Sequence, residues 1–266
     1  MLRAYDALLA VTEEDRQLLL ALFDEPERTR QAAKLTVVPI CIDPARVAPV
    51  DHSPNCPATQ PSGHQSTNFP IYQPTPPTIL HLGTMFWPPN VTGVLWFARE
   101  VLPLVWAELP EARFVIVGKN PPPEVQALPT DPRIEVTGYV ADPLPYLQAA
   151  DAFVVPLFSG GGMRVKILDA WLWGLPIVST PLGAEGLDLR DGENILLAGD
   201  PASFAESTVR LLTDPTLNHR LRTQGRAWVE LAYDWQKVYP RVDAVYENIL
   251  ADSRRAHREG AKNAKG

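Results

Sequence analysis

The residues best suited to chemistry lie in the segment 159–180, which reads SGGGMRVKILDAWLWGLPIVST. Its three consecutive glycines, 160–162, allow the backbone to turn several N–H groups toward one point and to approach a ligand closely. The apolar pattern predicts a helix that begins near Met163, and the unpaired N–H groups of a helix start favour an anion. Arg164 and Lys166 add positive charge, and a guanidinium group can bind a phosphate through two parallel hydrogen bonds. The segment therefore predicts a site for a diphosphate.

Asp169 follows Lys166 by three residues, so a helix would place the two side chains on one face. A carboxylate suits the hydroxyl groups of a ribose or a sugar better than a phosphate, so we expect Asp169 to bind such hydroxyls. The glycine spacing differs from the dinucleotide-binding fingerprint, and the segment lacks the Gly-Lys-Ser/Thr ending of the nucleotide triphosphatase loop. A generic turn before a helix is the simpler alternative for this segment taken alone.

The elements that must position these residues form a regular alternation of strands and helices that starts at Thr78. Continuous apolar runs are typical of strands whose two faces are both covered by helices. The alternation predicts an α/β fold with a doubly wound parallel sheet, in which ligands bind beyond the carboxyl ends of the strands. The glycine loop follows one strand, and Gly83-Thr84, Gly118-Lys119 and Gly138-Tyr139 follow others. We expect all of these segments to line one rim of the sheet.

The rest of the chain divides by composition. Residues 1–43 read as a short module with a helix capped by Thr12, and residues 44–77 as a proline-rich linker. Residues 251–266 are basic, lack apolar periodicity and are expected to be a disordered tail. His81 and His219 are the histidines that could act as general bases, but we expect both to be structural and assign no catalytic residue.

The overall charge and the apolar pattern limit the function classes. The formal net charge of −7 argues against a general nucleic-acid binder. The two cysteines have no metal-ligand spacing and lie in or near the proline-rich stretch, so we expect no disulfide framework and a reducing compartment. No apolar run reaches the length of a membrane span, and the first residues lack the layout of a signal peptide. A cytoplasmic location is the expectation, with weak attraction of the basic tail to the inner face of a membrane as the alternative.

Three motifs carry a resemblance to a known family: GGGMRVKILD, GLPIVST and GAEGL. They resemble the carboxy-terminal half of family 4 glycosyltransferases, which are retaining enzymes of the GT-B fold. The likeness covers residues 78–250 well and residues 5–43 loosely. It implies that 78–233 is a Rossmann-like domain that binds a nucleotide sugar, that 234–250 is the helix that crosses back, and that 1–43 is a remnant of the acceptor domain.

The resemblance also implies roles for single residues. The family has two glutamates that are separated by seven residues, and the position of the second is taken here by Asp169, while Gly161 stands at the first. Asp169 would contact the ribose hydroxyls, as the second glutamate does in the family. The remaining donor-binding positions implied by the motifs are Gly83 and Thr84 with their backbone N–H groups, Tyr139 and Val140 near the nucleobase, and Gly160, Gly162, Met163, Arg164 and Lys166 around the diphosphate.

The function implied is transfer of a hexosyl group from a nucleotide-diphosphate sugar to an unknown glycan or lipid-linked acceptor, with retention of configuration and without a cofactor. Main-chain N–H groups and cations would take the place of a metal. Because only the last part of an acceptor domain is recognisable, the chain is expected to be a truncated enzyme, a split gene product or a diverged donor-binding remnant. A non-catalytic nucleotide-binding module and a nucleotide-sugar epimerase, which can share the fold, are the two alternatives.

Overall fold

The computed structural model describes residues 5–47 and 76–263. The first of these segments forms a small β-α-α-β module in which two parallel strands pair, with Leu8 opposite Leu35. As predicted, Thr12 caps the first helix, because its Oγ1 accepts a hydrogen bond of 3.0 Å from the N–H of Asp15. The elements of this module are β1 (Leu8–Ala10), α1 (Glu13–Leu20), α2 (Glu27–Ala32) and β2 (Leu35–Val37).

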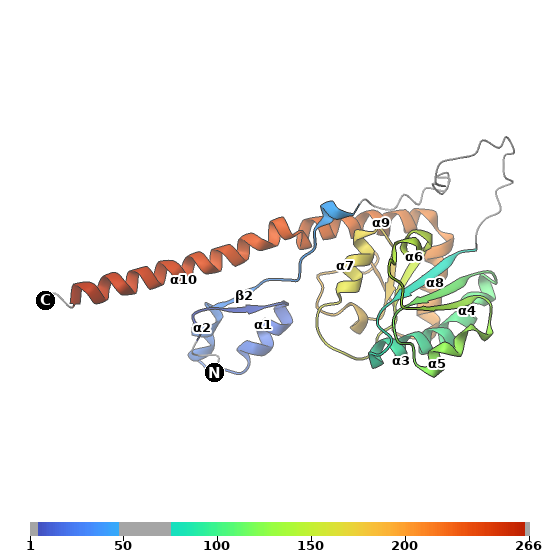
Figure 1. Cartoon of the computed structure of the whole chain (residues 1–266), viewed down its shortest axis with the longest axis horizontal. Coiled ribbons are helices and arrows are strands. Elements are labelled where there is room, and N and C mark those ends of the chain that lie inside the picture. Colours follow the sequence, from blue (N-terminus) through green and yellow to red (C-terminus); the bar gives the residue numbers. More distant parts are fainter. Residues whose placement is uncertain (1–4, 48–75, 264–266) are drawn as a thin grey trace, which may run out of the picture.

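The second segment is built on a six-stranded parallel sheet with the order β5-β4-β3-β6-β7-β8 (Figure 1). The predicted α/β fold with a doubly wound parallel sheet is confirmed. Since β6 lies beside β3, the loops that follow these two strands are neighbours at the carboxyl edge. The strands are β3 (Thr78–Leu82), β4 (Arg113–Val117), β5 (Ile134–Gly138), β6 (Ala152–Val155), β7 (Ile177–Ser179) and β8 (Leu196–Leu197).

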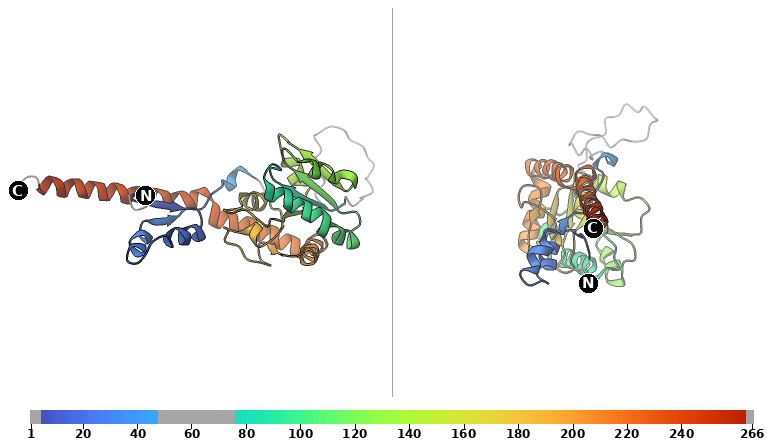
Figure 2. Two further views of the ribbon diagram at one scale, coloured as in Figure 1. Left: turned by 90° about the horizontal axis from the view of Figure 1, so that it is seen from below. Right: turned by 90° about the vertical axis from the view of Figure 1, so that its left-hand side faces the viewer.

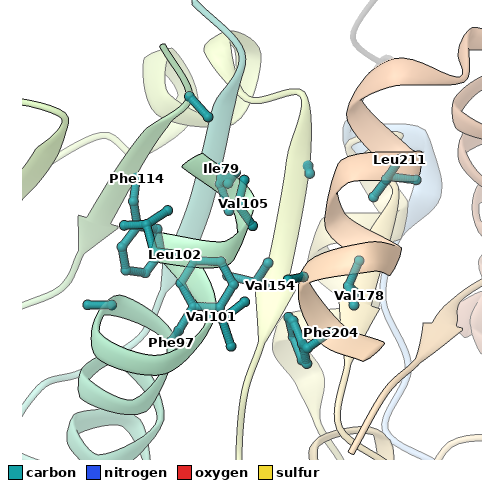
Figure 3. Packing of buried hydrophobic residues seen from close by; sticks show 14 of the residues in the cluster. Ile79, Phe97, Val101, Leu102, Val105, Phe114, Val154, Val178, Phe204 and Leu211 are labelled. Carbon is teal, nitrogen blue, oxygen red and sulfur yellow. The ribbon is translucent and has the colours of Figure 1, made fainter. Parts of the chain in front are cut away.

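Helices cover both faces of the sheet, which explains why its strands are apolar on both sides. Ile79 of β3 belongs to one buried cluster and the next residue, Leu80, belongs to the other. Figure 3 shows the first cluster, in which Phe97 and Phe114 pack with a ring separation of 4.6 Å. The helices are α3 (Pro88–Trp96), α4 (Leu102–Glu108), α5 (Pro123–Gln126), α6 (Leu144–Ala149), α7 (Val165–Leu172), α8 (Pro201–Thr213) and α9 (Pro215–Trp228), with π-helical turns at Phe97–Val101 and Val229–Tyr233 and 3₁₀ turns at Pro44–Arg46, Leu128–Thr130 and Leu182–Ala184.

The last helix, α10 (Trp235–Asn263), projects away from the six-stranded domain (Figures 1 and 2). The predicted boundary at residue 250 and the disordered tail that was expected after it are therefore wrong, at least up to Asn263. The reason is that residues 251–263 contain no proline and many good helix formers, and extending an existing helix avoids the cost of nucleation.

The segment before the predicted linker is attached to the start of α10. Ile42 donates its N–H to the carbonyl oxygen of Tyr233 at 2.9 Å, and Trp235 donates to the carbonyl oxygen of Ile42 at 2.9 Å. The guanidinium of Arg226 binds the carbonyl oxygen of Pro44 at 3.0 Å. Residues 44–47 thus lie against the domain, whereas residues 48–75 of the predicted linker lie outside the described residues.

Candidate functional site

The predicted rim brings together the loops that follow β3, β4 and β6. A Cβ atom on Gly160 would lie 2.8 Å from the ring of Trp87, so the glycine loop packs directly against the loop after β3. A Cβ atom on Gly118 would lie 1.8 Å from the carbonyl oxygen of Gly83, so the backbones after β3 and β4 also touch. Only glycine permits such close approach at these two positions.

The glycine loop leaves a row of main-chain donors without partners. Within the part of the chain that the structure describes, the N–H groups of residues 160–164 donate to no protein acceptor. Gly160 and Gly162 have φ angles of +95° and +86°, which L side chains rarely adopt. The helix that follows begins at Val165, two residues later than predicted, so Met163 and Arg164 belong to the loop. Successive unpaired N–H groups before a helix are a known arrangement for anions.

Arg164 does not project toward a ligand, which corrects the prediction of a phosphate-binding fork. Its side chain is only 5% exposed. Nη1 donates to the carbonyl oxygen of Gly161 at 2.9 Å, and Nη2 donates to that of Gly160 at 2.6 Å. Burial lowers the pKa of the guanidinium, and the Glu185 carboxylate, 3.8 Å away, acts against that shift. Arg164 therefore holds the backbone of the glycine loop in place.

The bonds of Arg164 also set the direction of the loop N–H groups. In a trans peptide unit the C=O of one residue and the N–H of the next point in opposite directions. Since the C=O groups of Gly160 and Gly161 point at the guanidinium, the N–H groups of Gly161 and Gly162 point away from it. The sequence predicted a cation at this loop, but not that its partners would be carbonyl oxygens of the loop itself.

Lys166 reaches the end of β3 from the first turn of α7. Its Nζ donates to Oδ1 of Asn90 at 2.7 Å, and it would lie 2.9 Å from a Cβ atom on Gly83. Burial, and secondly the charge of Arg164, lower the pKa of Lys166 to about 7. In the described residues no carboxylate lies within ion-pair distance of Nζ, so none of them supplies a counterion to this amine.

His81 is fully buried on β3, as the sequence predicted, and its Nδ1 contacts the carbonyl oxygen of Val154 at 2.9 Å. Burial lowers its pKa far below the usual value, and the charge of Lys166 adds to the shift. A histidine held neutral in this way is structural at ordinary pH. His219 lies on an exposed helix surface, also as predicted.

Asp169 lies on the exposed side of α7, one turn after Lys166. The body of the domain around it desolvates the carboxyl group and raises its pKa. No hydrogen bond within the described residues occupies this carboxylate. It is thus available to accept hydrogen bonds from hydroxyl groups.

The other predicted positions, which follow β3 and β5, differ in their exposure and in their hydrogen bonds. The N–H of Gly83 donates to the carbonyl oxygen of Val117 at 3.0 Å, so the prediction that this group faces a phosphate is wrong. The carbonyl oxygen of Thr84 is held by Asn90 at 2.9 Å. Tyr139 is 75% exposed after β5, while Val140 packs against the second buried cluster.

Asn90 is the residue of this site that the sequence reasoning missed. It lies in the first turn of α3, is 2% exposed and joins the loop after β3 to Lys166. The signal was present in the sequence, since a buried amide just after WPP at a helix start needs polar partners. Nothing in the spacing indicated that one of the partners would come from α7.

Comparison with known proteins identifies the family. The family model described as Glycosyl transferases group 1 matches residues 76–214, just over half of the chain. The chain belongs to this family. The phosphatidyl-myo-inositol mannosyltransferase of Mycobacterium leprae is 30% identical over 178 residues, which cover 65% of this chain and 46% of that protein. The lipopolysaccharide core biosynthesis glycosyltransferase LpsE of Rhizobium meliloti is 35% identical over 95 residues, 35% of this chain and 28% of that protein.

Solved structures support the same fold. A sucrose-phosphate synthase from Thermosynechococcus elongatus superposes with a TM-score of 0.66 at 20% identity, covering 94% of this chain and 60% of that one. HepE from Anabaena, solved in complex with UDP and glucose, superposes with a TM-score of 0.64 at 13% identity over 92% of this chain and 64% of that one. The six-stranded unit is thus like the carboxy-terminal domain of a GT-B glycosyltransferase, as the resemblance implied.

The chain spans about half the length of the curated relatives it matches. Among the described residues, none of the helices combines the length and the apolar character needed to span a bilayer. A search of the same residues finds no group of three or more His, Cys, Asp or Glu side chains that could hold a metal ion.

Proposed function

We propose that this chain binds a nucleotide-diphosphate sugar at the rim formed by the loops after β3 and β6, and that it is the donor-binding part of a retaining glycosyltransferase. The main support is the row of unpaired N–H groups from Gly160 to Arg164, together with the amine of Lys166 at the end of β3. Donors that are fixed before the ligand arrives stabilise a developing anion without the cost of reorganisation. In glycosyl transfer that anion is the departing nucleoside diphosphate.

The other predicted residues fit subsites around this anion. Asp169, one turn farther along α7, would accept hydrogen bonds from ribose hydroxyls. Tyr139 would offer an exposed ring to the nucleobase. Arg164 would act on the anion only through the shape of the loop, because its guanidinium is already bonded to backbone oxygens.

The relatives suggest where to begin the search for substrates. HepE was solved with UDP and with UDP-glucose. We infer that uridine nucleotides are the first donors to examine and that a hexosyl group is transferred. The names of the relatives mention phosphatidyl-myo-inositol and lipopolysaccharide core. We infer an acceptor of the same broad class, a lipid-linked or polymeric glycan.

Isothermal titration calorimetry of the purified chain tests donor binding. UDP, GDP, ADP and their hexose conjugates are titrated in turn, and we expect one base to bind clearly more tightly than the other two. Lys166→Ala should weaken this binding at least tenfold, since a hydrogen bond to a charged group contributes about 1.5–3 kcal/mol. Exposed Lys237→Ala is the matched control and should bind normally. Absence of heat with every nucleotide would overturn the proposal.

A further inference from the structure

The contacts of Asn90 exceed what the start of a helix requires. Both ends of its buried amide are used: Nδ2 donates to the carbonyl oxygen of Thr84 at 2.9 Å, and Oδ1 accepts from Nζ of Lys166 at 2.7 Å. One side chain thus joins the loop after β3, the first turn of α3 and the first turn of α7. The amide therefore fixes the position of the Lys166 amine as well as that of the loop.

The backbone at Gly83 is shaped around this pair. A Cβ atom there would lie 2.6 Å from Nδ2 of Asn90 and 2.9 Å from Nζ of Lys166. Gly83 has no positive φ angle that would by itself call for glycine. The missing side chain therefore leaves room for the amide and the amine at the end of β3, where a ligand of the sheet would bind.

Among the residues that the structure describes, no anion pairs with the Lys166 amine. Asn90, its one hydrogen-bond partner among them, is neutral. Arg164, just before α7, carries a positive charge, and its guanidinium lies 3.8 Å from the carboxylate of Glu185. His81 on β3 is buried and neutral, and Asp169 lies one turn farther along α7. The lowered pKa of Lys166, about 7, agrees with this arrangement.

We propose that Asn90 is a positioning residue that holds the Lys166 amine at the end of β3 without a counterion, so that an incoming diphosphate becomes its counterion and the amine takes up a proton from solvent on binding. This inference rests on the proposed function. Above neutral pH the free amine is largely uncharged and the bound one is charged. Binding therefore consumes up to one proton, and affinity falls as pH rises.

The first test needs no ligand. The chain has six lysines, so ¹³C-lysine labelling gives a spectrum simple enough for Lys166 to be assigned by its loss in Lys166→Met. We expect its signal to titrate near pH 7 in the wild type and at least one pH unit higher in Asn90→Asp, where a carboxylate stabilises the ammonium. Asn194→Ala, which removes another buried amide, one that binds the N–H of Arg190 and not this amine, is the matched control. A wild-type titration near pH 10 would overturn the proposal.

The second test uses UDP as the probe, in calorimetry at pH 8 in buffers of different ionisation enthalpy. We expect the wild type to take up close to one proton. We expect UDP to bind to Asn90→Ala at least tenfold more weakly and with little proton uptake. Without the bond to Asn90, Lys166 is solvated and already charged before UDP binds. If Asn90→Ala lowers only the melting temperature and leaves affinity and proton uptake unchanged, Asn90 is merely structural and the proposal fails.

The two proposals can fail separately. A wild type that binds no nucleotide overturns the proposed function, whatever the titration of Lys166 shows. A wild type that binds UDP with no proton uptake at pH 8 overturns the role given to Asn90 and leaves donor binding intact.

Discussion

Nη1 of Arg164 lies 2.9 Å from the carbonyl oxygen of Gly161, a residue three positions earlier in the chain. This bond directs the C=O of Gly161 toward the guanidinium and therefore turns the N–H of Gly162, in the same peptide unit, away from it. A cation beside a glycine-rich loop can thus build an anion site without touching the anion. The distinction matters for mutagenesis, because removing Arg164 should change the loop first and the affinity as a consequence.

Arg164→Lys should loosen the glycine loop although it keeps the charge. A lysine cannot present two fixed donors to the carbonyl oxygens of Gly160 and Gly161 as a guanidinium does. We expect larger backbone motion in residues 160–163, measured as lower order parameters in ¹⁵N relaxation, and nucleotide affinity lowered about tenfold, the equivalent of about 1.4 kcal/mol. Arg190→Lys, at an exposed ion pair with Glu193, is the control. Unchanged order parameters in the loop would contradict the role given to Arg164.

Two neighbouring glycines of the loop should respond differently to alanine. A Cβ atom on Gly161 meets nothing within 4 Å, and Gly161 has no positive φ angle. Gly162 is equally open but has a φ angle of +86°. We expect Gly161→Ala to leave the free energy of unfolding nearly unchanged, and Gly162→Ala to lower it by about 1 kcal/mol because of backbone strain. Urea denaturation of both variants provides the comparison, and equal effects would contradict the geometry.

Asp169→Asn should separate recognition of the nucleoside from recognition of the diphosphate. The carboxylate lies a turn beyond Lys166 and would accept hydrogen bonds from ribose hydroxyls. We expect UDP to bind about tenfold more weakly, in line with the loss of a hydrogen bond to a charged group. Inorganic pyrophosphate, which lacks the ribose, should bind as it does to the wild type. If both ligands are weakened equally, Asp169 acts on the loop and not on the ribose.

Local patterns in the sequence were sufficient for the fold and for the position of the rim. Continuous apolar strands and turn residues predicted a parallel sheet with Gly83 and the glycine loop at one edge, and the structure has this sheet. The strand order β3-β6, which makes those loops neighbours, could not be read from the sequence, because it depends on long-range pairing. The resemblance to the family supplied what the patterns lacked.

The directions of the side chains could not be predicted from the sequence. A motif shows that Arg164 and Lys166 flank a helix start, but not which acceptors their nitrogens find. Arg164 turned to carbonyl oxygens of its own loop, and Lys166 found Asn90, 76 residues away. The extent of α10 differs from the prediction for another reason: low apolar periodicity predicts no helix, whereas helix propensity alone can extend a helix that already exists.

Lys166→Met should alter how stability depends on pH. The pKa of Lys166 is about 7 in the folded chain, against 10.5 for a free lysine. Between these values the unfolded state binds more protons, so the free energy of unfolding of the wild type rises with pH, by at most about 1.4 kcal/mol per pH unit. Lys166→Met lacks this contribution to the pH dependence of the free energy of unfolding.

The cost of burying the charged amine is fully present below pH 7 and disappears toward pH 10.5. The gain in the free energy of unfolding of Lys166→Met over the wild type should therefore be largest at pH 6.5 and be lost by pH 9.5. Urea denaturation at the two pH values measures the change, and Lys237→Met controls for removal of an exposed lysine. Parallel pH profiles for wild type and Lys166→Met would show that the amine is ordinarily solvated.

Gly225→Ala should destabilise the domain through packing alone. A Cβ atom on Gly225 would lie 2.2 Å from Cδ1 of Trp171, a fully buried ring whose Nε1 donates to the carbonyl oxygen of Asn194 at 2.9 Å. Alanine favours a helix over glycine by about 1 kcal/mol, whereas overpacking a core costs about 1–3 kcal/mol. With so short a contact and a ring held by its hydrogen bond, packing should dominate. We expect a loss of about 1–2 kcal/mol in the free energy of unfolding. Gly199→Ala, which meets no atom within 4 Å, should show no such loss. A stabilised Gly225→Ala would mean that α9 can move away from Trp171.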